Sequence, residues 1–360
     1  MTATVGSPQA APRVLLFSMY PLDRGLWGAT TRITQLRDAL ARRVQLDVIS
    51  GTRAGRAIAM ARFVASRRLG GLAGIYVENS TALPGPADLL FLAIARTRRI
   101  PILTYVRDAQ QLFPEYYRTT SLKRHLSRAL FLPAVRPLMA ISTIVAFPSA
   151  GLAAAVVRNR RPTVEPTLLP PGSRIASASP VDPAARGILF VGALSYAVHG
   201  AAILLDAMRL ARASDHQLTL ICVSRPGDEP SGPLPSWLRV VRAEGEEIDA
   251  LLPQVLATIT PRRRSPYNDL AVPIKVMEYL GYARPMIVTD TLETAAIVRG
   301  AECGVIVPDT AEGLADGIRT VASASPDQIR LWAEAARRAA VTNSWDVRAA
   351  TILDLLRVNT

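Results

Sequence analysis

Short, nearly continuous apolar runs recur along the chain, and segments with helical periodicity separate them. A run without alternation of polar and apolar residues is typical of a parallel strand that is buried on both faces. Arg13–Tyr20 is such a run, and the further strands predicted in the first half of the chain are Val44–Ser50, Ala73–Val77, Ile100–Val106, Ile141–Phe147 and Thr167–Leu169. Because strands and helices alternate, the sequence predicts a doubly wound α/β fold with a parallel sheet.

A second series of strands begins after a change in composition. Between Gly172 and Gly187, Ser, Ala, Pro and Asp dominate, which is typical of a linker. The strands predicted beyond it are Gly187–Gly192, Leu218–Val223, Leu238–Arg242, Val255–Thr260, Met286–Thr289 and Gly304–Val307. Two tandem α/β sheets are expected to face a central cleft, where such sheets bind ligands at their strand ends.

Helical periodicity fills most of the intervals between strands. One helix is predicted with Thr30 or Thr31 as its N-cap, and another is predicted from Glu246. Further helices are predicted at 87–97, from 121, and at 201–212, 274–282, 311–322, 326–340 and 346–358.

The length of 360 residues fits two domains of roughly 150 residues each. We expect residues 1–12 to form a mobile tail and residues 13–172 the first domain. Residues 173–186 are the predicted linker, and residues 187–342 the second domain. Residues 343–360 are predicted to form a C-terminal helix.

Composition places the chain among globular proteins, since 49% of its residues are hydrophobic. Two cysteines exclude a disulfide scaffold and favour a reducing cytosol. The N-terminus lacks the basic start and apolar core of a signal peptide, and no clean apolar stretch reaches the ~20 residues that a membrane span needs. A cytoplasmic protein, soluble or peripheral on the membrane, is expected.

The net charge of +13 favours anionic partners. Residues 121–132 predict a basic amphipathic helix, which could lie on an anionic membrane or simply pack on its sheet. Its apolar and basic faces are Leu122, Leu126 and Leu130 against Lys123, Arg124 and Arg128. Nucleic acid is not an expected partner, because the basic runs are not interleaved with aromatic residues.

The stretch from Arg262 to Asp290 contains the most informative pattern. The free amides ahead of its helix would cradle a diphosphate at the positive helix end. These are the amides of Leu270, Ala271, Val272 and Ile274, with Pro273 suited to the first turn. Lys275 and Glu278 share a face, so the lysine could approach a phosphate and the carboxylate could accept two ribose hydroxyls. The alternative is a solvated ion pair on an ordinary helix.

Three segments of the second half carry a family resemblance, and they follow each other in this order: PIKVMEYLGYARPMIVTD, GVIVPDTAEGLADGI and NSWDVRAATILDLL. They resemble the donor-binding motif, the Gly-apolar-Val-Pro segment and the closing Ser-Trp-Glu helix of bacterial GT-B glycosyltransferases of the family 4 type. The resemblance implies two Rossmann-like domains and a final helix that packs back on the first domain. It also implies that Glu278 holds the nucleotide ribose, that Lys275 lies near the diphosphate, and that Val272 belongs to the donor site.

The strand-turn GILFVGALSYAVHG resembles the family's Val-Gly-Arg-Leu turn followed by Lys-Gly, and places Gly192, Ala193 and His199 in the donor site. Ala193 stands where an arginine is usual, and His199 where a lysine is usual. Those cations neutralise the leaving diphosphate, so another group has to supply the charge. The run of arginines 262–264 offers replacements, and Arg264 is the preferred one.

A second departure concerns the position eight residues before Glu278. Many family 4 enzymes carry a glutamate there, whereas this chain has Leu270. The carboxylate that would contact the sugar is therefore absent, or is replaced by the nearby Asp269.

The segment YVRDAQQLFPEYY resembles the Arg-Asp-x-x-Pro-Glu-like loop of bacterial transferases of this group, with two additional residues. Asp108 would accept the acceptor's proton in an inverting reaction or orient the sugar in a retaining one. A loop or N-cap role is the alternative. Glu115 is a weaker candidate for the acceptor side. Gly25 and Gly28 resemble the family's glycine loop.

The sequence therefore predicts transfer of a hexosyl-type sugar from a nucleotide diphosphate sugar to a glycan, lipid-linked or secondary-metabolite acceptor, as in polysaccharide biosynthesis. No Asp-x-Asp pair or cluster of metal ligands is present, so we expect metal-independent chemistry and no cofactor besides the donor. Two alternatives are a nucleotide-sugar epimerase and a non-catalytic nucleotide-sugar-binding protein.

Overall fold

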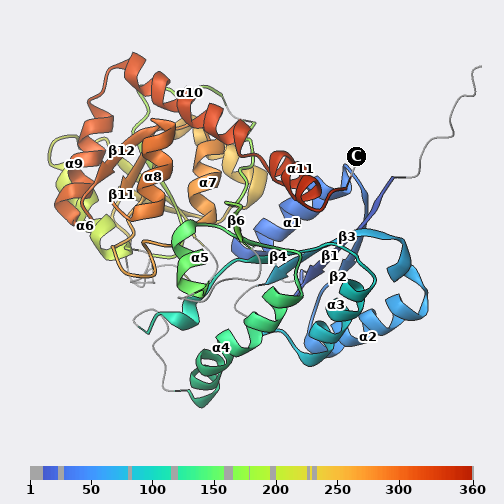
Figure 1. Cartoon of the computed structure of the whole chain (residues 1–360). Helices are drawn as coiled ribbons and strands as arrows, with labels where there is room; N and C mark the ends of the chain where they lie inside the picture. Colours follow the sequence, from blue (N-terminus) through green and yellow to red (C-terminus); the bar gives the residue numbers. More distant parts are fainter. Residues whose placement is uncertain are drawn as a thin grey trace, which may run out of the picture. The chain divides into compact units, whose positions relative to one another are not determined.

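A computed structural model describes residues 11–22, 28–79, 83–114, 121–157, 165–177, 179–194, 200–224, 228 and 233–358 (Figure 1). The chain divides into two compact units. The first unit combines Met1–Pro170 with Trp345–Thr360, and the second unit is Pro171–Ser344. Each unit is built around a six-stranded parallel sheet, so the predicted α/β class is confirmed.

The first unit has the strand order β2-β1-β3-β4-β5-β6. Its strands are β1 Arg13–Ser18, β2 Gln45–Ile49, β3 Leu72–Asn79, β4 Ile102–Val106, β5 Ile144–Phe147 and β6 Pro166–Leu168. Its helices are α1 Gly28–Ala41, α2 Arg53–Ala65, α3 Pro86–Thr97, α4 Leu122–Ile141, α5 Ala150–Val157 and α11 Trp345–Leu355, with short 3-10 helices η1 Arg68–Gly71 and η2 Gln110–Leu112.

Both faces of the first sheet are buried, which explains the unbroken apolar run of β1. Successive residues of this strand, such as Leu16 and Phe17, belong to two different core clusters. One cluster includes residues of α1 and α11, which pack against each other, and the other includes residues of α2 and α3. Phe17 stacks on Phe91 of α3 with 6.0 Å between the ring centroids.

The second unit has the strand order β12-β11-β10-β7-β8-β9. Its strands are β7 Gly187–Val191, β8 Thr219–Val223, β9 Leu238–Val241, β10 Val255–Thr260, β11 Met286–Thr289 and β12 Gly304–Val307. Its helices are α6 Ala201–Arg212, the 3-10 helix η4 Gly245–Gln254, α7 Ile274–Gly281, α8 Leu292–Ala301, α9 Ala311–Ala322 and α10 Pro326–Thr342.

Several local predictions are wrong. The helix α1 begins at Gly28, so Thr30 and Thr31 lie inside it and do not cap it. The segment predicted as a helix from Glu246 is a 3-10 helix. The helices α2, α5 and α8 were not predicted, because their short, alanine-rich sequences lack a clear polar face. Among the described residues, no helix is both long and apolar enough to cross a membrane.

The predicted linker is part of the second unit. Its described residues lie in neither helix nor named strand, yet Ala176 and Val181 are buried in the core of that unit. The amide of Ala176 donates to the carbonyl of Gly281 at 3.1 Å, which attaches this segment to the end of α7. Gly281 permits this approach, since a Cβ there would lie 1.7 Å from the carbonyl oxygen of Arg174.

Candidate functional site

The candidate donor site in the second unit begins where β7 ends. The backbone N–H of Val191 donates to the hydroxyl of Tyr279 at 2.8 Å, which ties the end of the strand to α7. The next residue, Gly192, has φ +154°, a conformation that favours glycine. Its amide donates to the carbonyl of Val223 at the end of β8, at 2.9 Å. Ala193 follows and is buried. The turn is therefore fixed against both α7 and β8.

The ammonium group of Lys275 lies directly against this turn. Its Nζ is 4.7 Å from the ring centroid of Phe190, which is a cation–π distance. A Cβ added to Gly192 would lie only 2.7 Å from Nζ. The sequence predicted Lys275 and Gly192 in one site, and the structure brings them together.

The N-terminus of α7 exposes amides near this lysine. Pro273 is the N-cap, with φ −67° and ψ 136°, and is not within the first turn as predicted. Among the described residues, the amides of Ala271, Val272 and Ile274 donate to no backbone partner. The predicted fourth amide is not free, because Leu270 donates to the carbonyl of Tyr267 at 3.2 Å. Three amides, half-buried in this segment, remain for an anion.

Glu278 lies one turn further along α7 and is half-buried. Burial raises the pKa of this carboxyl group, while Arg174 and then Lys275 act to lower it. Arg174 is itself held by Asp249, with one N–O contact of 2.9 Å, and its guanidinium lies 5.9 Å from the ring centroid of Tyr282. Two cations, Arg174 and Lys275, therefore act electrostatically on the carboxyl group of Glu278.

Sequence reasoning missed Arg174. It belongs to the segment that composition marked as a linker, a hundred or so positions from Glu278 along the chain. No local pattern indicates that Arg174 lies near α7; the small Gly281 is the one sign that another backbone approaches this helix closely.

The three consecutive arginines at the end of β10 occupy different environments. Arg264 is exposed and pairs with Asp269, with Nη2 and Oδ2 3.1 Å apart, and Asp290 lies 3.9 Å away. Arg262 is 7% exposed, and its Nε has no hydrogen-bond partner in the described parts of the chain. Arg263 is exposed. Because β10 and β7 are parallel neighbours, Arg262 and Gly192 follow strands that end at the same edge of the sheet.

Asp269, the predicted substitute for a sugar-binding glutamate, is engaged on two sides. Besides its pair with Arg264, its Oδ1 accepts from the amide of Leu292 at 3.3 Å, at the start of α8. This carboxylate therefore joins the loop between β10 and α7 to the start of α8.

The arginine of the Arg-Pro turn after α7 has a structural role. Arg284 is completely buried and donates to five backbone carbonyls and to no carboxylate of the described residues. The carbonyls belong to Ser179, Leu252, Val255, Tyr282 and Ala283. Burial lowers the pKa of this guanidinium to about 10. Arg284, just before β11, thus joins that strand to η4 and to the segment that was predicted as a linker.

In the first unit, Asp108 lies two residues beyond the end of β4. Its Oδ2 accepts from Nε2 of Gln110 at 2.9 Å. The preceding Arg107 lies over the ring of Tyr20, 5.5 Å from its centroid. At the same sheet edge, Asn79 ends β3; its amide is completely buried, and neither Nδ2 nor Oδ1 has a partner among the described residues. This orphaned amide is a polar candidate that sequence reasoning missed.

Three predicted residues lie outside the described part of the chain: Gly25, Glu115 and His199. Gly28 is the first residue of α1.

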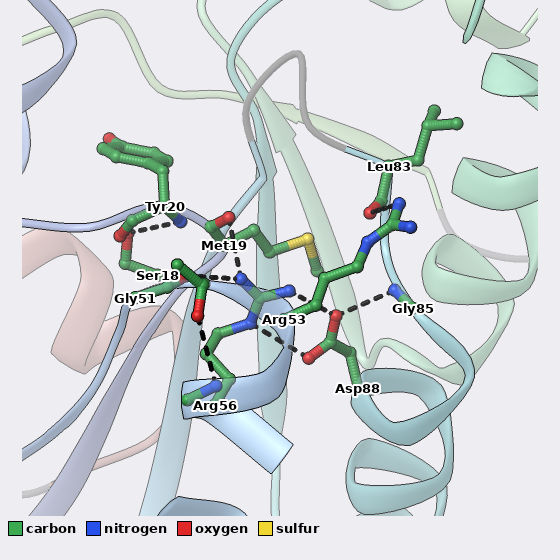
Figure 2. Close-up of polar contacts among 11 residues, drawn as sticks. Ser18, Met19, Tyr20, Gly51, Arg53, Arg56, Leu83, Gly85 and Asp88 are labelled. Carbon is green, nitrogen blue, oxygen red and sulfur yellow. Dashed lines mark hydrogen bonds and ion pairs between the residues drawn. The ribbon is translucent and has the colours of Figure 1, made fainter. Parts of the chain in front are cut away.

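A buried ion pair fixes the loops at the carboxyl edge of the first sheet. Figure 2 shows the guanidinium of Arg56 between the carboxylate of Asp88 and the backbone after β1 and β2. The two N–O distances to Asp88 are 3.0 and 2.6 Å. Arg56 also donates to the carbonyls of Met19 (3.0 Å) and Gly51 (2.7 Å), and Asp88 accepts from the amide of Gly85 (2.8 Å).

A second buried pair joins α1 to β3. Nε of Arg32 is 3.0 Å from Oε1 of Glu78, and the hydroxyl of Tyr76 donates to the other carboxylate oxygen at 2.5 Å. The guanidinium lies 3.8 Å from the ring centroid of Tyr105, whose pKa burial raises to about 12. Both arginine pairs rigidify the frame of the first unit.

The comparisons with known proteins agree with this architecture. Residues 185–324 match the profile of the family described as glycosyl transferases group 1. No curated protein matches the chain in a sequence search. Many solved structures resemble nearly the whole chain, and three of them illustrate the likeness.

Sucrose-phosphate synthase from Thermosynechococcus elongatus is 16% identical, with a TM-score of 0.66 over 96% of this chain and 98% of that one. HepE from Anabaena, solved with UDP and glucose, is 16% identical, with a TM-score of 0.64 over 96% of this chain and 99% of that one. WaaG, a glycosyltransferase involved in lipopolysaccharide biosynthesis, is 15% identical, with a TM-score of 0.61 over 96% of this chain and 100% of that one.

The chain therefore has the GT-B fold of two Rossmann-like units, as the resemblance implied. The resemblance to GT-B glycosyltransferases is confirmed, with the family match confined to the second unit. The match to the family of glycosyl transferases group 1 supports sugar transfer as the general activity.

Proposed function

We propose that the protein transfers a hexosyl group from a nucleotide diphosphate sugar, which the second unit binds, to a hydroxyl group of an acceptor. One observation carries the proposal: the ammonium group of Lys275 lies against the Gly192 turn, and Glu278 lies one helical turn away. The family match covers all three residues.

In this proposal the diphosphate contacts Lys275 and the amides of Val272 and Ile274 at the positive end of α7. Glu278 accepts hydrogen bonds from the two ribose hydroxyls. Burial raises the pKa of its carboxyl group, but the charges of Arg174 and Lys275 act against this and favour the ionised form that accepts both bonds.

Charge builds up on the diphosphate as the glycosidic bond breaks, and a cation has to stabilise it. Lys275 supplies one charge. For the second, Arg262 has a stronger physical case than the predicted Arg264. Its Nε is buried without a partner, whereas Arg264 is already paired with Asp269. A buried, unpartnered donor gains more from a phosphate oxygen than an arginine that first has to leave a carboxylate.

The acceptor is assigned to the first unit. Asp108 is the candidate for the residue that takes the acceptor's proton or orients the sugar, and the buried amide of Asn79 can bind a hydroxyl group. The acceptor class is a glycan, a lipid-linked intermediate or a secondary metabolite, and the reaction as proposed requires no metal ion. The site roles of four further residues remain predictions: Glu115, Gly25, Gly28 and His199.

Incubation with a panel of nucleotide sugars, with and without an extract of cellular lipids and glycans, tests the reaction. Release of nucleoside diphosphate that depends on the extract supports transfer. A changed sugar on an intact nucleotide would mean epimerisation. Binding without turnover under all conditions would mean a non-catalytic nucleotide-sugar-binding protein, and either result would overturn the proposal.

A pair of variants distinguishes the two cations. Arg262→Gln should lower kcat by about 100-fold, as expected for the loss of one charge-stabilising donor. Arg264→Gln, the matched control from the same loop, should lower it by less than about threefold. The reverse order would return the role to Arg264.

A further inference from the structure

One face of α4 is apolar and exposed along its whole length. Its members follow each other at helical spacing, and all of them are exposed: Leu122, Leu126, Ala129, Leu130, Pro133, Pro137 and Ala140. The three leucines are 83%, 56% and 42% exposed. At 1.5 Å per residue the face is about 27 Å long. Continuous exposed apolar surface of this size marks an interaction site.

The core of the first unit does not need this face. Phe131, Val135 and Leu138 lie on the opposite side of α4 and are completely buried, and the helix packs there against α3, β4 and η2. The amphipathic helix expected from the sequence is therefore real, but its leucines point away from the sheet. The helix does pack on its sheet, as the alternative predicted, but through Phe131, Val135 and Leu138 and not through the leucines.

Charge indicates what covers the face. The helix contains Lys123, Arg124, Arg128 and Arg136 and no acidic residue. The first unit has 25 lysines and arginines against 10 acidic residues, a net charge of +15. The second unit has 17 against 19, a net charge of −2. A genome-wide preference for arginine would affect both units, so it does not account for this difference.

We propose that this α4 face binds the surface of an anionic lipid bilayer. The leucines enter the boundary between headgroups and acyl chains, and the basic side chains attract anionic headgroups. A second copy of the chain fits less well, because two units of charge +15 would repel each other. The proposal goes beyond the reaction and does not depend on it.

Flotation of the full chain with vesicles tests the proposal. Binding to phosphatidylglycerol-containing vesicles should exceed binding to pure phosphatidylcholine by about tenfold and fall as salt rises from roughly 50 to roughly 500 mM. The triple variant Leu122→Ser, Leu126→Ser and Leu130→Ser should reduce binding about tenfold. The matched control changes the similarly exposed Leu90 and Leu331 to serine and should bind as the wild type does.

A second measurement does not rely on removing apolar groups. Cys222 and Cys303 are buried, and burial raises the pKa of both thiols to about 12, so a cysteine introduced by Leu126→Cys can be labelled selectively. An environment-sensitive dye there should shift to the blue with anionic vesicles, and a dye on Leu90→Cys should not. Equal shifts at both positions, no vesicle binding, or a dimer that the serine variant dissociates would overturn the proposal.

Discussion

The two units share one architecture but use charge differently. The first unit is strongly basic and buries two arginines against carboxylates, Arg32 with Glu78 and Arg56 with Asp88. The second unit is nearly neutral and buries Arg284 against backbone carbonyls alone, among the described residues. The family match lies in the second unit. In the proposed function the second unit binds the donor, whereas the first unit combines buried ion pairs with an excess of basic residues.

The largest effect is expected in the first unit. Asp88→Ala leaves Arg56 as an uncompensated buried charge and should lower the free energy of unfolding by about 3–5 kcal/mol. The urea transition of the first unit measures it. Changing both residues, Arg56→Met with Asp88→Leu, removes both charges and should restore much of the loss. A cost below about 1 kcal/mol for Asp88→Ala would show that this pair does not hold the frame.

A smaller effect on donor affinity is expected in the second unit. In Gly192→Ala, the new Cβ meets Nζ of Lys275 and the backbone is strained at φ +154°. Affinity for nucleoside diphosphate should fall about tenfold by calorimetry. Gly300→Ala is the matched control, because a Cβ at Gly300 has nothing within 4 Å. Equal affinity of the two variants would separate the Gly192 turn from the donor site.

The smallest effect concerns the pH dependence of stability. The pKa of Glu278 is raised in the folded protein, so its contribution to stability is present in acid and is lost as pH rises through the folded-state pKa. The Tm of Glu278→Gln relative to the wild type should therefore rise, by about 2 °C, between about pH 4 and about pH 7.5. Glu312→Gln, at an exposed position in α9, should show no such trend. A relative Tm that falls with pH would contradict the assigned direction.

Local patterns predicted every strand of both sheets, because most of these strands are buried and their sequences are rich in apolar residues. They did not reveal α2 or α8, in which alanines and arginines give no clear stripe. Only the resemblance to GT-B glycosyltransferases, and no local pattern, predicted Lys275 and Gly192 in one site.

Long-range contacts were beyond reach. The pairing of Arg174 with Asp249 spans 75 positions, and that of Arg32 with Glu78 spans 46. Nothing in a run of three arginines distinguishes the buried Arg262 from the ion-paired Arg264; only the fold of the loop after β10 separates them.

The central claim is that Glu278 and the start of α7 form a nucleotide-sugar site. The most direct test is calorimetric titration of the full chain with UDP, GDP, ADP and TDP. At least one nucleotide should bind the wild type, and Glu278→Ala should weaken that binding by about 10- to 100-fold, as the loss of two hydrogen bonds to a charged group predicts. Glu312→Ala should leave it unchanged. Equal affinity of Glu278→Ala and the wild type would contradict the account.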